Sequence, residues 1–255
     1  MTFTLLKEFT KRDFTERYSG SVLGVFWTFI WPLVNIFIYT VIFSKIMSAK
    51  LPGVSNSYSY GLYLIAGLVP WTAFSSTISR STGIFLDKKN IISKVNISLP
   101  SFPLYIVLSE SITFLITMTF YLCFIVFSGH GISKQYLFLP FIFCIQQIFA
   151  YSLGFLLATL TVFIRDIKEF VGIIMQIWFW FTPIVYVRTI LPEWVFNLME
   201  YNPALYFVEA YQKIFVFKEQ PDFSKLIILT IIGHIIMFIS YYLFKKLEKD
   251  VRDFI

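Results

Sequence analysis

The chain has 255 residues, of which 57% are hydrophobic and 20% aromatic, while only 14% are charged. A soluble globular domain carries roughly 25% charged residues, and a chain this apolar would leave large hydrophobic surfaces in water. The composition therefore excludes an ordinary soluble domain and predicts an integral membrane protein. The formal net charge of +6 is modest, and we do not interpret it as nucleic-acid binding.

The amino-terminal stretch, residues 1–21, mixes acidic, basic and apolar side chains. It lacks the short apolar run and the small-residue cleavage site of a secretory signal, so we expect no cleavable signal peptide. Its apolar positions fall on one broad arc, which predicts an amphipathic helix lying at the cytoplasmic interface. The interface residues that we single out are Arg12, Asp13, Arg17 and Tyr18.

Six stretches of the chain are long and apolar enough to suggest membrane crossing, which needs roughly 20 apolar residues. They predict transmembrane helices at 22–46, 58–85, 99–128, 135–164, 168–187 and 225–244. With both termini inside, fourteen Lys and Arg residues lie on the cytoplasmic side and seven on the other. This bias follows the positive-inside rule. We expect a single transmembrane domain over residues 1–255, with both ends in the cytoplasm.

Aromatic and amide side chains recur in the first and fifth predicted spans. Those of the first span are four residues apart, so they form one stripe along a helix. Flat aromatic faces mixed with amides and hydroxyls suit sugar rings, although Trp and Tyr are also enriched at membrane interfaces and in contact with lipid. The residues of this candidate sugar-contacting pattern are Trp27, Trp31, Asn35, Tyr39, Gln176, Trp180 and Tyr186.

The cytoplasmic connection over residues 86–97 reads as a short basic helix with an apolar edge. Such an edge suits a groove on a partner protein, and the alternative is a helix lying on the inner leaflet. The residues of this predicted docking helix are Asp87, Lys88, Lys89, Asn90, Ile91, Ile92, Lys94 and Val95.

Residues 191–217 are apolar and aromatic but are interrupted by prolines. Pro192 can open a short helix, and Asn202 can cap a second one with Pro203 at its first position. Pieces of about 10–14 residues are too short to cross a bilayer, and such backbone must be buried in protein or border a wet cavity. The prediction is a re-entrant gate at the outer mouth, and the alternative is a helical hairpin on lipid. The gate residues are Pro192, Trp194, Asn202, Pro203 and Tyr206.

No catalytic or metal-binding pattern stands out in the sequence. Cys123 and Cys144 have neither metal-ligand spacing nor a disulfide framework, and no Walker A motif is present. A transporter of this sequence therefore needs a gradient or the ATPase of another chain. The candidate for a gradient-driven carrier is Glu110, about 15 Å into its span. Its alternative is a buried acid paired with Arg80.

A membrane enzyme acting on lipid-linked sugars is a further alternative. It needs clustered charged groups at the membrane surface. The nearest candidates are Asp166, Lys168 and Glu169, which lie in one short turn. We expect instead a chain with no catalytic residue, metal site or bound cofactor of its own.

Several short motifs together resemble the permease subunits of bacterial ABC exporters of the type 2 class, above all those exporting O-antigen, capsule and teichoic-acid polymers. The resemblance covers nearly the whole chain, and its most specific part is the entry into the first span. The matching residues are Arg12-Asp13, Arg17-Tyr18-Ser19, Ser21-Val22-Leu23-Gly24, Trp27, Pro32, Gly67-Leu68-Val69-Pro70-Trp71, Asn90, Ile91, Lys94, Pro100, Pro103, Arg165-Asp166, Asn202-Pro203 and Glu209-Ala210.

This resemblance implies a homodimeric channel in the bacterial inner membrane, driven by two separate ATPase subunits that bind ATP and Mg. Segment 86–97 would be the coupling helix, residues 1–21 the interface helix and residues 191–217 the outer gate. The first and fifth spans would line the path. The cargo would be a polysaccharide on an undecaprenyl-type lipid, and the alternatives are teichoic acid, another lipid or a drug. The implied partners are a second copy, the ATPases, the cargo and membrane lipid, with no nucleic acid.

Overall fold

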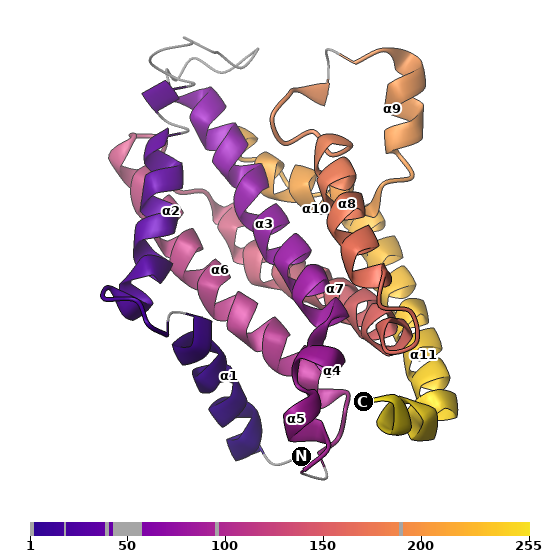
Figure 1. Cartoon of the computed structure of the whole chain (residues 1–255). Coiled ribbons are helices and arrows are strands. Elements are labelled where there is room, and N and C mark those ends of the chain that lie inside the picture. Colours follow the sequence, from indigo (N-terminus) through magenta and orange to yellow (C-terminus); the bar gives the residue numbers. More distant parts are fainter. Residues whose placement is uncertain (1–2, 18, 39–40, 43–57, 95–96, 189–190) are drawn as a thin grey trace.

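The computed structural model describes residues 3–17, 19–38, 41–42, 58–94, 97–188 and 191–255. Over these residues the chain forms helices and no strand, as predicted for an all-helical membrane protein. Figure 1 shows the long helices α3, α6, α7 and α11 as a bundle, with α1 and the carboxyl terminus at one end and α9 at the other.

Four helices are long and apolar enough to cross a membrane: α3 (Ser59–Thr82), α6 (Ser101–Phe127), α7 with its preceding turn (Lys134–Thr161) and α11 (Phe223–Phe254). They coincide with the predicted spans at 58–85, 99–128, 135–164 and 225–244, as expected for an integral membrane protein. The apolar stretch of α3 is 78% buried, against 28% for α6 and 22% for α11. Helix α3 is therefore the central helix, while α6 and α11 lie at the periphery.

The other two predicted spans are shorter in the structure. Helix α2 (Trp27–Ile38) has 12 residues and α8 (Ile167–Trp180) has 14. At 1.5 Å per residue they are about 18 and about 21 Å long, less than the hydrocarbon thickness of about 30 Å. The six full-length spans are thus not confirmed. The range 22–46 runs partly outside the described residues, whereas α8 ends because Phe181 caps it and Pro183 follows soon after.

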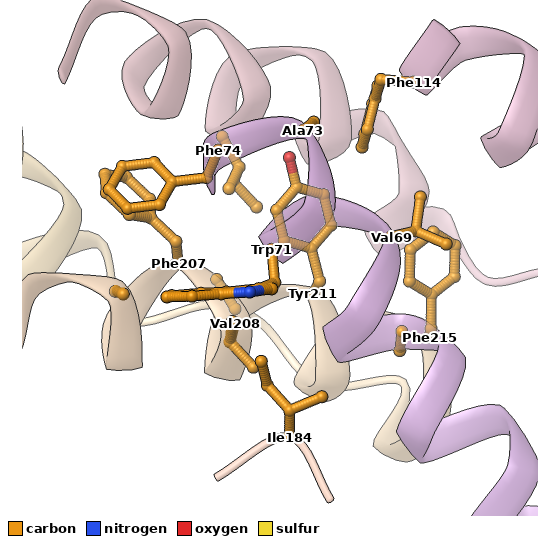
Figure 2. Packing of buried hydrophobic residues seen from close by; sticks show 14 of the residues in the cluster. Val69, Trp71, Ala73, Phe74, Phe114, Ile184, Phe207, Val208, Tyr211 and Phe215 are labelled. Carbon is orange, nitrogen blue, oxygen red and sulfur yellow. The ribbon is translucent and has the colours of Figure 1, made fainter. Parts of the chain in front are cut away.

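Residues 191–217 contain the two short helices that the sequence predicts, α9 (Glu193–Met199) and α10 (Pro203–Gln212), followed by a π-helical turn over Lys213–Phe217. Helix α10 lies in the interior of the bundle, because most of its residues are buried against α3 and α7. Figure 2 shows Trp71 and Phe74 of α3 close to Phe207 and Val208 of α10.

Gly67 of α3 is what allows α10 to come this close. A Cβ atom at Gly67 would stand 3.0 Å from Nε2 of Gln212 and 3.2 Å from Cγ1 of Val208. The aromatic rings of this core extend to α8, where Trp178 lies edge-on to Phe74 at 5.4 Å. The core therefore fixes α8 and α10 on one side of α3.

The end of the bundle nearest the amino terminus is built from α1 (Phe3–Arg17), α4 (Ile84–Asp87) and α5 (Lys89–Ile92). Helix α1 confirms the predicted amino-terminal helix and packs against α6, where Phe9 stacks on Tyr105 at 5.6 Å. The docking segment 86–97 is two short helices rather than one, since the chain breaks at Lys88. Both are held by a second apolar cluster around Phe85 and Phe102.

Candidate functional site

A cavity of about 180 Å³ lies between α2, α3 and α6. The stripe predicted on the first span lines it, with Trp27, Trp31 and Asn35 on one face and the two indole rings 6.3 Å apart. Tyr39 lies outside the described residues. The remaining lining is Thr28, Pro32, Ile36, Ile65, Leu68, Val69, Thr72, Ala73, Glu110, Thr113, Phe114 and Thr117. Aromatic faces and hydroxyls thus meet in one hollow.

The path residues predicted on the fifth span are not at this cavity. Gln176 and Trp180 are exposed on α8, which packs on α3, and Figure 1 shows α2 and α8 on opposite sides of α3. Tyr186 lies beyond the end of α8, and its hydroxyl donates to the carbonyl of Trp180 at 2.6 Å. Trp31 and Trp180 are both 59% exposed. One chain therefore presents two separate aromatic faces.

Beside the cavity, four charged side chains from three helices form a buried network. Glu110 of α6 is 4% exposed and Asp13 of α1 is 8% exposed. Oε1 of Glu110 receives Nη1 of Arg80 at 2.5 Å and Nη2 of Arg17 at 2.7 Å. The carboxylate of Asp13 accepts hydrogen bonds from the guanidinium groups of Arg80 at 2.5 Å and Arg17 at 3.3 Å. It also accepts one from the Ser109 hydroxyl at 2.5 Å. Two acids and two bases balance, so the network holds no net charge.

This network confirms the pairing of Glu110 with Arg80. Sequence reasoning missed that Asp13 and Arg17 complete it, because these residues were assigned only to the membrane interface. The available signal was their spacing, since residues i and i+4 share a helix face and this face also carries Leu6 and Thr10 against α6. Arg12 instead is exposed and pairs with Glu16 at 2.6 Å. Tyr18 lies outside the described residues.

Ion pairs connect the docking segment to α1 and to α8. Lys88 contacts Glu16 of α1 at 2.6 Å, and Lys168 at the start of α8 contacts Asp87 at 3.1 Å. The hydrogen bond from Lys88 holds the pKa of Glu16 below its ordinary value of 4.5. The segment is thus connected to α1 and α8 through two ion pairs.

The apolar edge of the docking segment points inward, which corrects the sequence interpretation. Ile92 is 6% exposed and belongs to the chain's own second cluster, with Ile91 packed against it. Lys89, Asn90 and Lys94 are exposed instead. The exposed surface of the segment is therefore mainly polar and basic, because Ile92 is buried and Ile91 is partly buried. Val95 lies outside the described residues.

Asn202 joins the segment 191–217 to α8 through hydrogen bonds. Its side chain accepts the backbone N–H of Ala204 at 2.9 Å, as predicted for a cap with Pro203 at the first position. It also accepts the indole N–H of Trp178 at 2.6 Å, and its amide nitrogen donates to Phe181 and Thr182. Every hydrogen-bonding direction of this amide is used, so Asn202 is a structural junction.

The rest of the predicted gate is more exposed. Pro192 directly precedes α9, and Trp194 on α9 is 72% exposed. The hydroxyl of Tyr206 donates to the carbonyl of Glu200 at 2.8 Å. Arg188 reaches Glu200 at 3.3 Å and lies over the ring of Phe196 at 3.8 Å. These contacts tie the end of α9 to the turn before it.

Comparison with known proteins settles the family. The model of the ABC-2 type transporter family matches residues 4–216. The chain belongs to this family. It is 31% identical to an O-antigen export system permease protein RfbA of Klebsiella pneumoniae, over 96% of this chain and 93% of that protein. It is 25% identical to the RfbA protein of Myxococcus xanthus, over 98% and 94%.

The ABC-2 match spans α1 through α10, and so includes the cavity, the charge network and the docking segment. The alignment with the relatives also extends over α11, since it covers nearly the whole chain. This ABC-2 chain is therefore a multi-pass membrane protein comparable in its full length to export permeases.

Proposed function

We propose that this chain is the membrane subunit of an ATP-driven exporter that moves a lipid-linked, O-antigen-like polysaccharide outward from the cytoplasmic side of the bacterial inner membrane. The observation that carries the proposal is the similarity, over nearly the full length of both chains, to proteins named as O-antigen export permeases. ATP and Mg bind in this proposal to a separate partner chain, because the sequence has no Walker A motif.

Two copies form the channel in this proposal. Each chain exposes one aromatic face on α2, with Trp31, and another on α8, with Trp180. A twofold axis would set α2 of one copy against α8 of the other and so bring both faces to one path. Aromatic faces with amide and hydroxyl groups offer a sugar chain stacking and hydrogen bonds without full charge.

The docking segment transmits ATPase movement in this proposal. Its outward surface is basic and suits an acidic groove on an ATPase. Its ion pairs with α1 and α8 give it two routes into the membrane domain. Because Ile92 is buried and Ile91 is partly buried, the partner contact is assigned to the exposed residues Lys89, Asn90 and Lys94.

The outer gate is assigned to α9 and the turn before it. Trp194 and Pro192 are exposed there, whereas Asn202 is buried and hydrogen-bonded to Trp178, Phe181 and Thr182. Cysteines at position 194 in the two copies are expected to cross-link and block export. Normal export by fully cross-linked protein would remove the gate from α9.

The test of the proposal is a mild-detergent pull-down from native membranes, assayed for a co-purifying ATPase, together with surface polysaccharide in a strain lacking the gene. We expect an ATPase near one-to-one and loss of surface polymer without the chain. Lys89→Glu with Lys94→Glu should release the ATPase from folded permease, whereas Lys134→Glu, an exposed lysine elsewhere, should not. A chain that purifies alone and leaves surface polysaccharide unchanged would refute the proposal.

A further inference from the structure

A groove of about 440 Å³ runs over α7, between α6 and α11. Among the side chains that line it are Leu104 and Ser111 of α6, Cys144 and Tyr151 of α7, and Met237 of α11. Helices α2 and α8, as the structure describes them, contribute no side chain to it. The groove is therefore separate from the aromatic faces that we assign to the path between two copies.

The lining of this groove suits hydrocarbon. Within the described part of the chain, no Asp, Glu, Lys, Arg or His lines it. Its hydroxyl protons are already used, since Tyr151 donates to the carbonyl of Pro100 at 3.1 Å. Ser111 likewise donates to the carbonyl of Val107 at 2.7 Å. A charged or strongly polar ligand would lose its hydration in the groove without gaining partners, whereas an acyl chain would not.

The groove lies within one leaflet of the membrane. The hydrogen bond from Tyr151 to Pro100 places its mouth at the start of α6, which directly follows the docking segment. Ser111 is ten residues from the first residue of α6, Ser101, or about 15 Å at 1.5 Å per residue. This depth is about half of the hydrocarbon thickness of about 30 Å. The groove therefore opens at the membrane surface beside the docking segment and ends near the bilayer centre.

Two lysines lie just beyond the mouth of the groove. Phe244 of α11 packs against Phe155, one turn beyond the groove on α7, with the ring centres 5.2 Å apart. Lys245 and Lys246 follow Phe244 directly, and both are exposed. Nζ of Lys245 lies 5.9 Å from the ring centre of Tyr241. The Lys245 side chain thus leans back along α11, towards the turn that lines the groove.

Both lysines are available to a phosphate. Lys245 pairs with Glu248 at 2.9 Å, but the two side chains are 53% and 30% exposed, and such a surface pair contributes little. Lys246 forms no ion pair with any residue that the structure describes. Lysines next to a membrane-spanning helix attract anionic lipids. A zwitterionic lipid is attracted less, because it carries its own positive group.

We propose that this groove, together with Lys245 and Lys246, is a binding site for an anionic diacyl phospholipid. One acyl chain fills the groove between α6 and α11, and the phosphate contacts the two lysines. The inference goes beyond the proposed function, because its ligand is a lipid of the surrounding membrane. The exported polymer and its lipid carrier are assigned instead to the faces of α2 and α8.

The probe is phosphatidylglycerol with a diazirine in one acyl chain, diluted into phosphatidylcholine nanodiscs that hold the permease as it purifies from native membranes. Phosphatidylcholine with the same diazirine chain is the matched probe. We expect the anionic probe to label peptides covering residues 104–111 and 143–151 at least about five-fold more than the zwitterionic one, which is the effect of one lysine at the surface. Excess unlabelled phosphatidylglycerol should compete.

Two pairs of lysines separate this site from general attraction to the protein surface. Lys245→Gln with Lys246→Gln should remove the preference for the anionic probe, a loss of at least about five-fold. Lys7→Gln with Lys11→Gln should leave it unchanged. Those two lysines are also exposed and lie at the same end of the bundle, but on α1.

The two native cysteines give a second matched pair. Cys123 and Cys144 are both exposed, but only Cys144 lines the groove. Cys144→Trp fills the groove and should lower labelling of residues 104–111 by the anionic probe at least about five-fold. Cys123→Trp places the same ring elsewhere on the apolar surface and should not change the labelling.

Equal labelling by the two probes would overturn the proposal in favour of ordinary lipid contact, and so would equal effects of the two lysine pairs. Stronger competition by a polyprenyl phosphate than by phosphatidylglycerol would overturn it in favour of a site for the lipid carrier. The proposed function fails separately, through the absence of a co-purifying ATPase and of polymer export. Selective labelling in a chain without those properties would support the lipid site alone.

Discussion

Replacing Glu110 by Gln tests the charge network most directly. Oε1 of Glu110 receives both guanidinium groups, at 2.5 and 2.7 Å. The amide is nearly isosteric but uncharged, so Arg17 and Arg80 would share only Asp13. One excess positive charge would then lie in a region where Glu110 is 4% exposed.

Breaking a buried ion pair by removing one partner costs about 3–5 kcal/mol. The side chains of Arg17 and Arg80 are 25% and 30% exposed, so solvent screening places the cost near the lower end, about 3 kcal/mol. For a chain of this size, that corresponds to a melting temperature lower by on the order of 10 °C.

The assay is the melting temperature of the detergent-purified complex, read by fluorescence-detected size exclusion, beside export in cells. A second change, Arg80→Gln, removes the excess charge, so the double variant should recover part of the loss and show non-additivity. A gradient-driven carrier predicts a different pattern for Glu110→Gln, namely lost transport with unchanged stability. A melting shift under about 2 °C would refute the network as a stabilising element.

Three further predictions concern the junctions. Asn202→Ala should cost about 2–4 kcal/mol through the lost cap and the unpaired Trp178 indole, whereas Asn197→Ala on exposed α9 should be neutral by thermal melting. The pKa of Glu16 is lowered by Lys88, so the stabilisation from this pair is present above about pH 4.5 and lost as pH falls below it. Glu16→Gln should therefore flatten the pH dependence of melting in that acidic range. Ile92→Asp places a carboxylate in the second core cluster and should abolish folded protein by size exclusion, because the side chain packs within this chain rather than against a partner.

The sequence predicted those helices that neighbouring residues specify by themselves. Asn202 followed by Pro203 specifies a helix start by itself, since the side chain caps the turn that the proline begins. The four long spans follow from long stretches that are almost wholly apolar. The fifth span was overestimated because absence of charge was taken as helix, although Pro183 marks an early end.

The direction in which a helix face points was harder to predict than the presence of the helix. Ile91 and Ile92 form an apolar edge whether they meet another protein or this one, because periodicity gives a face but not its neighbour. The neighbour here includes Phe85 and Phe102, which only the fold brings to the segment. In the same way, spacing places Asp13 and Arg17 on one helix face but does not place that face beside Glu110, since Arg17 is 93 positions away.

Helix α1 joins the cavity to the docking segment through adjacent residues. Arg17 contacts Glu110, which lines the cavity, while Glu16 contacts Lys88 in the docking segment. Consecutive residues on one rigid helix cannot shift independently, because the backbone hydrogen bonds of α1 fix their spacing. A displacement of Lys88 that moves α1 through Glu16 would therefore also move Arg17 relative to Glu110 beside the cavity. The docking segment and the cavity are in this way connected within a single chain through α1, without any contribution from α8.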